Sequence, residues 1–202
     1  MNRFLSAALL ASLALGACDK PDPPEPTSPW APLITWDDAG GRILLAGQPA
    51  HVVKSWDFRR GAAGFEAANA DQRIEAGQGL VVAATAPDPV LRTPAGLDVA
   101  GKDAPLVVVR LTRTRPTDAW DGALYYSTRR HGESPQFMTY PANGPPPMAG
   151  RTALLVYDLS NPRVGGRDWT RSIIEQVRVD LDAGAGGEVV VHQVALIGEP
   201  NR

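Results

Sequence analysis

The chain has 202 residues, of which 44% are apolar and 21% are charged, and its formal net charge is −2 at pH 7. This length suits one globular domain with appendages. The nearly balanced charge lacks the basic footprint of a nucleic-acid-binding protein, so we expect no nucleic-acid partner. The 20 glycines and 19 prolines favour many short strands and turns over long helices.

The N-terminal segment has the layout of a secretory signal peptide. Arg3 precedes the apolar run 4–15, and small residues then lead to Cys18, the single cysteine of the chain. The apolar run is too short for a stable membrane span. Residues 1–17 are therefore predicted to be a signal peptide, and the lone cysteine excludes an intramolecular disulfide.

These residues resemble the signal of bacterial lipoproteins, in which the cysteine carries the lipid. The resemblance implies that Cys18 is lipidated, that membrane lipid is a partner, and that the protein is anchored in the bacterial cell envelope facing the periplasm. Asp19 resembles the inner-membrane retention signal of enterobacterial lipoproteins and slightly favours that membrane. An ordinary signal peptide followed by a chance cysteine is the alternative.

A proline-rich stretch follows the cysteine, with six prolines between Asp19 and Pro32. Such a stretch cannot bury a core and favours extended polyproline II. At ~3.1 Å per residue it would span roughly 40 Å. We interpret residues 18–35 as a lipid-anchored linker, with a proline-rich recognition motif as the alternative, and place the folded domain at 36–202.

The domain consists of short apolar segments separated by turn residues. Strands are expected at 43–46, 52–58, 78–86, 106–114, 123–128, 136–140 and 152–159, and a single helical turn at 169–173. No amphipathic helical pattern of useful length follows the signal peptide. The pattern predicts an all-β sandwich of about eight to nine antiparallel strands.

Residues 173–197 contain two runs of alternating apolar residues separated by a glycine-rich break, which predicts two paired strands. In the first run, Val177, Val179 and Leu181 share one face. In the second run, strict alternation places Val190, His192, Val194 and Leu196 on one face. The segment 106–114 alternates in the same way, with Val107, Val109 and Leu111 on one face and Val108, Arg110 and Thr112 on the other.

A series of short landmarks runs along the domain in a recognisable order. They include Trp56-Asp57-Phe58, Asp88-Pro89, Leu124-Tyr125-Tyr126, Tyr157-Asp158-Leu159 and Val177-Arg178-Val179-Asp180. Their order and spacing resemble the galactose-binding-like jelly roll of carbohydrate-binding modules over roughly residues 50–198. The resemblance implies a jelly-roll fold, non-catalytic binding of a glycan or polysaccharide, and a candidate structural calcium. A structural module that docks another envelope protein is the alternative.

Sugar recognition needs aromatic plates and planar polar side chains. The candidate plates are Trp120, Tyr126, Tyr140 and Trp169. The candidate hydrogen-bonding residues, if their strands share a sheet, are Arg110, Gln176, Arg178 and Asp180. An arginine paired for structural reasons is the favoured alternative, with Arg178 joined to Asp158 or Asp180, because an unpaired charge on a covered face costs several kcal/mol.

Other chemistry has weaker support in the sequence. Asp180 and Asp182 lie two apart and could contribute to a calcium site, but a solvated turn edge is the favoured interpretation, since no D-x-D-x-D-G run is present. His51, His131 and His192 lack metal-ligand spacing; His192 suits a satisfied sheet residue and His131 a solvated loop. Nucleophile-elbow, P-loop and dinucleotide motifs are absent from the sequence, so no enzyme activity is expected.

Overall fold

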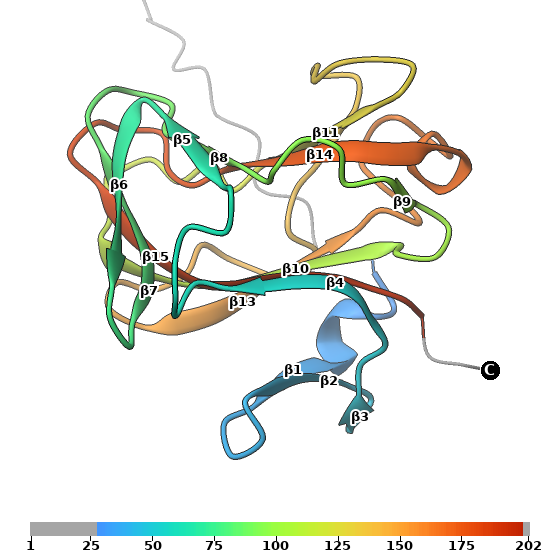
Figure 1. Ribbon diagram of the computed structural model, residues 1–202, viewed down its shortest axis with the longest axis horizontal. Helices are drawn as coiled ribbons and strands as arrows, with labels where there is room; N and C mark the ends of the chain where they lie inside the picture. Colours follow the sequence, from blue (N-terminus) through green and yellow to red (C-terminus); the bar gives the residue numbers. More distant parts are fainter. Residues whose placement is uncertain (1–27, 200–202) are drawn as a thin grey trace, which may run out of the picture.

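Two six-stranded sheets face each other across one apolar core in the computed structural model, which describes residues 28–199 (Figure 1). Every paired register in both sheets is antiparallel. The structure therefore confirms the predicted fold class, an all-β jelly-roll sandwich. Helical structure in this part of the chain is limited to two 3-10 turns, η1 (Ala31–Leu33) and η2 (Trp169–Arg171).

The first sheet has the order β13-β10-β15-β7-β6, and β4 pairs with the C-terminal part of β15. Its strands are β4 (Val52–Asp57), β6 (Ala70–Glu75), β7 (Gly79–Ala84), β10 (Leu106–Arg115), β13 (Thr152–Asp158) and β15 (Glu188–Ile197). The long central strands β10 and β15 carry the alternating apolar runs seen in the sequence. Val107, Val109 and Leu111 point into the core, as predicted.

The second sheet has the order β12-β11-β14-β8-β5, and β9 pairs with the start of β14. Its strands are β5 (Glu66–Ala68), β8 (Val90–Arg92), β9 (Val99–Ala100), β11 (Leu124–Thr128), β12 (Met138–Thr139) and β14 (Ile173–Asp180). Val177 and Val179 face the core from β14, which confirms their predicted side. The helical turn expected at 169–173 is η2.

A small N-terminal sheet covers part of the outer face of the first sheet (Figure 1). It consists of β1 (Ile34–Asp37), β2 (Arg42–Leu45) and β3 (Gln48–Pro49). Its apolar residues join outward-facing residues of the sandwich in a second cluster, which includes Ala31, Ile34, Ile43, Leu45, Leu106, Val108, Val156, Ala195 and Ile197. The hydroxyl of Ser28 donates to Asp158 at 2.5 Å, so the chain is packed against the sandwich from Ser28 onward.

The strands β14 and β15 belong to different sheets, so the predicted pairing of the two C-terminal runs is wrong. The glycine-rich break 181–187 carries the chain from one sheet to the other. Both strands have buried apolar faces that meet across the core, and each finds its hydrogen-bonding neighbours elsewhere. Alternation indicates which side of a strand is buried, but not which strand lies beside it.

A β-bulge at His192 changes the predicted facing of β15. Arg110 pairs with Gln193 and the next residue, Leu111, pairs with Val191, so His192 is the extra residue. Because a bulge shifts the alternation by one residue, Val189 and Val191 face the core before the bulge and Val194 and Leu196 after it. The prediction was correct for Val194 and Leu196 and wrong for Val190, which faces the other way.

The predicted signal peptide, the predicted lipidation site Cys18, Asp19 and the first part of the expected linker lie outside the described residues. Within residues 28–199, no helix has the length and apolar character needed to cross a membrane.

Candidate functional site

Two of the expected aromatic plates belong to the core. Tyr126 and Trp169 are each 0% exposed, and their rings meet edge to face with 5.0 Å between centroids. The indole N–H of Trp169 donates to the carbonyl oxygens of Gly101 and Ala104, both at 3.0 Å. Neither ring offers a face to a ligand, which corrects the expectation that these two residues stack on sugar.

The strand alternation of β11 explains the correction. Leu124 and Tyr126 point into the core, whereas Tyr125 points outward. Tyr125 pairs with Arg178 across the β11–β14 ladder, and the guanidinium of Arg178 lies 4.8 Å from the centre of its ring. Sequence reasoning missed Tyr125, although the period of two could have identified it.

The outer face of the second sheet is a network of paired charges. Arg178 donates to both carboxylate oxygens of Asp180, at 2.6 and 2.8 Å. Arg92 forms a similar two-bond contact with Glu133, at 2.8 Å for each bond. Of the two partners considered for Arg178, Asp180 is therefore the one observed. Charge-assisted pairs of this geometry are strong and orient their side chains, so Arg178 and Asp180 are committed to each other.

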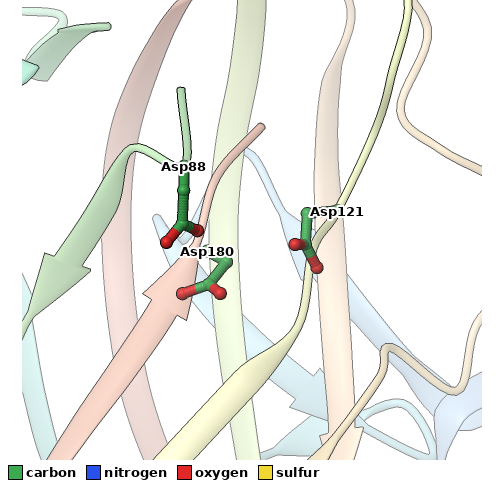
Figure 2. A group of neighbouring side chains, drawn as sticks. All are labelled: Asp88, Asp121 and Asp180. Atoms are coloured by element: carbon green, nitrogen blue, oxygen red, sulfur yellow. The ribbon is translucent and has the colours of Figure 1, made fainter. Parts of the chain in front are cut away.

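Three carboxylates gather beside this network. Asp88 follows β7, Asp121 precedes β11 and Asp180 ends β14, and Figure 2 shows the three side chains grouped together. Each offers an oxygen atom within 4.8 Å of the others. Burial raises the pKa of Asp180 to about 6, against the opposing effect of the Arg178 guanidinium. The group could hold a metal ion, although Arg178 already supplies one positive charge there.

Asp182 does not join this group and is not a solvated turn edge. Its side chain is buried and accepts a hydrogen bond from Arg113 Nη2 at 2.9 Å. It also accepts from the backbone N–H of Thr117 at 3.3 Å and from the Thr117 hydroxyl. Asp182 thus fixes the loop after β10. The sequence interpretation of Asp180 and Asp182 as exposed is corrected for both.

Arg110 lies on the outer face of the first sheet, away from these groups. Its guanidinium is 4.4 Å from the centre of the Trp36 ring in the N-terminal sheet, and desolvation there lowers its pKa. His192 lies on the same face and is satisfied, as predicted, with Nε2 2.8 Å from the Thr112 hydroxyl and Nδ1 2.6 Å from the Gln78 carbonyl oxygen. His131 is not a solvated loop residue, because its ring stacks on Phe137.

The remaining predicted plates, Trp120 and Tyr140, come together in one pocket of about 740 Å³. We call it the loop pocket. Most of the lining comes from two segments, 117–121 and 140–146, which we call its two walls. Arg113, Leu155, Arg163 and Ala183 complete the lining. Its volume falls in the range of small-ligand sites, ~300–1,000 Å³.

Two anchors hold the walls of the loop pocket. Asn143 donates from its amide nitrogen to the Leu154 carbonyl oxygen and accepts the backbone N–H of Val156 at 2.9 Å, which fixes the proline-rich wall to β13. In the other wall, Gly122 has a φ of +71°, and a Cβ there would lie 2.5 Å from the Trp120 ring. The absence of a side chain at Gly122 therefore leaves room for the Trp120 ring in its observed position.

Each plate of the loop pocket has a guanidinium at its ring. Arg113 lies 4.8 Å from the centre of the Trp120 ring, and Arg163 lies 5.2 Å from the centre of the Tyr140 ring. Asp118 and Asp121 add carboxylates to the same wall as Trp120. The pocket thus combines flat apolar surfaces with planar hydrogen-bonding groups, the combination that binds a sugar ring and its hydroxyls.

Sequence reasoning missed the four charged residues of the loop pocket. Arg113 carried a signal, since it shares the core-facing side of β10 with Val109 and Leu111 and therefore needs a buried partner. Asp118, Asp121 and Arg163 lie in proline- and glycine-containing loops without periodicity. No sequence signal distinguishes them from other loop charges.

The chain matches no family model and no curated protein. It does resemble solved structures. The xylan-binding module CBM15 is 10% identical, with 75% of this chain and 99% of that chain covered and a TM-score of 0.51. A family 29 carbohydrate-binding module from Piromyces equi is 9% identical, covering 70% and 89%, with a TM-score of 0.45. A carbohydrate esterase from the Shiga toxin-encoding bacteriophage phi24B is 12% identical, covering 75% and 100%, with a TM-score of 0.45. The similarity to CBM15 supports the fold.

Proposed function

We propose that this domain binds a glycan in the loop pocket without catalysing its breakdown. The observation that carries the proposal is the meeting of Trp120 and Tyr140, far apart in the sequence, in a pocket that also holds Asp118 and Asp121. Aromatic rings cover the apolar face of a sugar, and carboxylates accept hydrogen bonds from its hydroxyls. The jelly-roll fold shared with a xylan-binding module is consistent with this role.

A non-catalytic role agrees with how the carboxylates of the loop pocket are placed. Glycoside cleavage uses two carboxyl groups that flank the scissile bond. Asp118 and Asp121 are three residues apart in one segment of the lining, and the segment 140–146 supplies no carboxylate. The other carboxylates near this segment are held by arginines. Asp182 is bound by Arg113 and Thr117, and Asp88 and Asp180, which lie beside Asp121, both pair with Arg178.

The cellular setting of the proposal comes from the N-terminal sequence. We propose a lipid anchor at Cys18, followed by the proline-rich linker, which would hold the domain off a membrane of the bacterial cell envelope. Asp19 slightly favours the inner membrane. A glycan of the periplasm or cell wall would then be within reach of the loop pocket.

The test is a glycan array followed by titration calorimetry with the bound oligosaccharide. We expect Tyr140→Ala and Trp120→Ala each to weaken binding about tenfold, equivalent to about 1.4 kcal/mol. Trp36→Ala is the matched control, because this half-buried aromatic lies outside the loop pocket. Melting temperatures of all variants identify any loss that comes from unfolding.

Binding of both Tyr140→Ala and Trp120→Ala at the wild-type level would contradict the proposal. An array without a bound glycan, together with an envelope protein captured by the immobilised domain, would favour the alternative of a docking module. The exposed large apolar side chains of residues 28–199 lie in separate segments of the chain: Leu33 in η1, Val52 in β4, Ile74 in β6 and Met148 in the loop before β13.

A further inference from the structure

The two arginines of the loop pocket differ in what neutralises their charge. Arg113 is paired with Asp182 at 2.9 Å, and the two side chains are only 6% and 2% exposed. It also donates to the carbonyl oxygens of Thr117 and Pro147. The positive charge of Arg113 is therefore compensated by Asp182. In the pocket, its guanidinium packs against the Trp120 ring.

Arg163 has no such partner. Its side chain is exposed, and it forms no ion pair with the residues that the structure describes. Its backbone N–H donates to the Thr139 hydroxyl at 3.3 Å, which places the base of the side chain beside Tyr140. Among the described residues that line the loop pocket, Arg163 is thus the arginine without an ion pair, and it is held against one of the two plates.

We infer that the glycan carries a carboxylate, as in a uronic acid, and that Arg163 binds this carboxylate beside the Tyr140 ring. This inference rests on the proposed function. A guanidinium is planar and presents its N–H groups in a fork that matches a carboxylate with two hydrogen bonds. When the guanidinium lies over an aromatic ring, its N–H donors stay in the plane of the guanidinium. They can therefore still bind a carboxylate carried at the edge of a sugar ring.

Asp118 sets the orientation of the ligand. It lines the pocket in the same segment as Trp120, and its side chain is exposed. Its negative charge repels an acidic group, and its oxygens accept hydrogen bonds from sugar hydroxyls. The acidic sugar is therefore directed to the Tyr140–Arg163 side, and a neutral sugar to the Trp120 side. The pocket selects a glycan with acidic and neutral residues side by side.

The experiment compares pairs of oligosaccharides that differ in one carboxylate. Cellobiuronic acid is titrated beside cellobiose, and the array carries other uronate-bearing oligosaccharides, each beside the form in which the acid is reduced to the alcohol. We expect the wild-type protein to bind the acidic member of the recognised pair at least tenfold more tightly. Added salt should reduce this preference, since the Arg163 side chain is exposed.

Three variants identify the group that reads the acid. Arg163→Gln should weaken binding of the acidic member about tenfold more than it weakens binding of the neutral member. Arg163→Lys, which keeps the charge but loses the fork, should retain part of the preference. Arg167→Gln is the matched control, an exposed arginine nearby in the same loop that does not line the pocket.

The outcomes separate this inference from the proposed function. Equal or tighter binding of the neutral members, or a preference for acid that survives Arg163→Gln, would overturn the inference. Glycan binding in the loop pocket would still stand if Tyr140→Ala abolished it. An array on which no acidic member binds also overturns the inference, and one on which no glycan binds overturns both.

Discussion

Arg113 and Asp182 form an ion pair between Nη2 and Oδ2 at 2.9 Å, in which both side chains are almost completely buried. Removing one member leaves the other charged and without compensation, which costs about 3–5 kcal/mol. We therefore expect Asp182→Ala to lower the free energy of unfolding by about this amount in urea denaturation. Asp118→Ala, an exposed change in the neighbouring loop, should cost less than about 0.5 kcal/mol.

Replacing both members by apolar residues tests the same explanation. Arg113→Met combined with Asp182→Leu removes the two charges together, so most of the lost stability should return. A cost below about 1 kcal/mol for Asp182→Ala alone would show that the pair contributes little to the fold.

Val179 is a direct test of the sandwich. Its side chain is 5% exposed and packs in the main core from β14. Val179→Asp would bury an unpaired charge, and we expect circular dichroism to show an unfolded protein at 25 °C. Val52→Asp introduces the same change at an exposed strand position and should keep a cooperative melting transition. Similar melting curves for the two variants would contradict the assigned facing of β14.

Asp180 makes stability depend on pH. Burial raises its pKa to about 6 from the ordinary value of 3.8, so between these pH values the folded state binds the proton more tightly than the unfolded state. Its contribution to stability is therefore present below about pH 4 and is lost as the pH rises through about 6. One unit of pKa corresponds to about 1.36 kcal/mol, so a loss of about 1–3 kcal/mol is expected.

Asp180→Asn isolates this contribution because asparagine does not titrate. The free energy of unfolding of the wild type, measured in urea relative to that of the variant, should fall by about 1–3 kcal/mol between pH 4 and pH 7. A difference that stays constant over this range would mean that Asp180 has an ordinary pKa in the folded protein.

The proposed anchor lies outside the described residues and is tested in cells. Because Cys18 is the single cysteine, Cys18→Ser should move the protein from the membrane fraction to the soluble fraction. Asp19→Ser is the companion variant, which should stay with membranes while changing the balance between inner and outer membrane. Retention of Cys18→Ser in the membrane fraction would exclude a lipid on this residue.

The sequence predicts those strands in which every second residue is apolar because one face of the strand is buried in the core. In β10 and β14 it identified the facing of Val107 and Val179 correctly. The strand β6 is mostly exposed, and β8 and β9 have only three and two residues, so their residues carry no pattern that distinguishes strand from loop. Pairing was not predictable either, because backbone hydrogen bonds between strands leave no mark on side-chain type.

The candidate site was predictable in part. Trp120 and Tyr140 were expected as plates, and the structure brings them together in the loop pocket. Tyr126 and Trp169 were predicted as plates from their residue type alone. Both are buried in the core, because an aromatic ring suits core packing as well as it suits stacking on a sugar. Arg163 lies in a loop whose position depends on long-range contacts, which a local sequence pattern does not encode.

The N-terminal sheet determines how much of the chain must be kept when the domain is produced for experiments. A recombinant fragment trimmed to begin at residue 50 would uncover Leu106, Val108, Val156, Ala195 and Ile197, which now pack beneath Ile34 and Ile43. Such an exposed apolar patch would promote aggregation of the fragment in solution. The smallest well-behaved unit therefore begins no later than Ser28, and a poor yield from a shorter piece would say nothing about the sandwich itself.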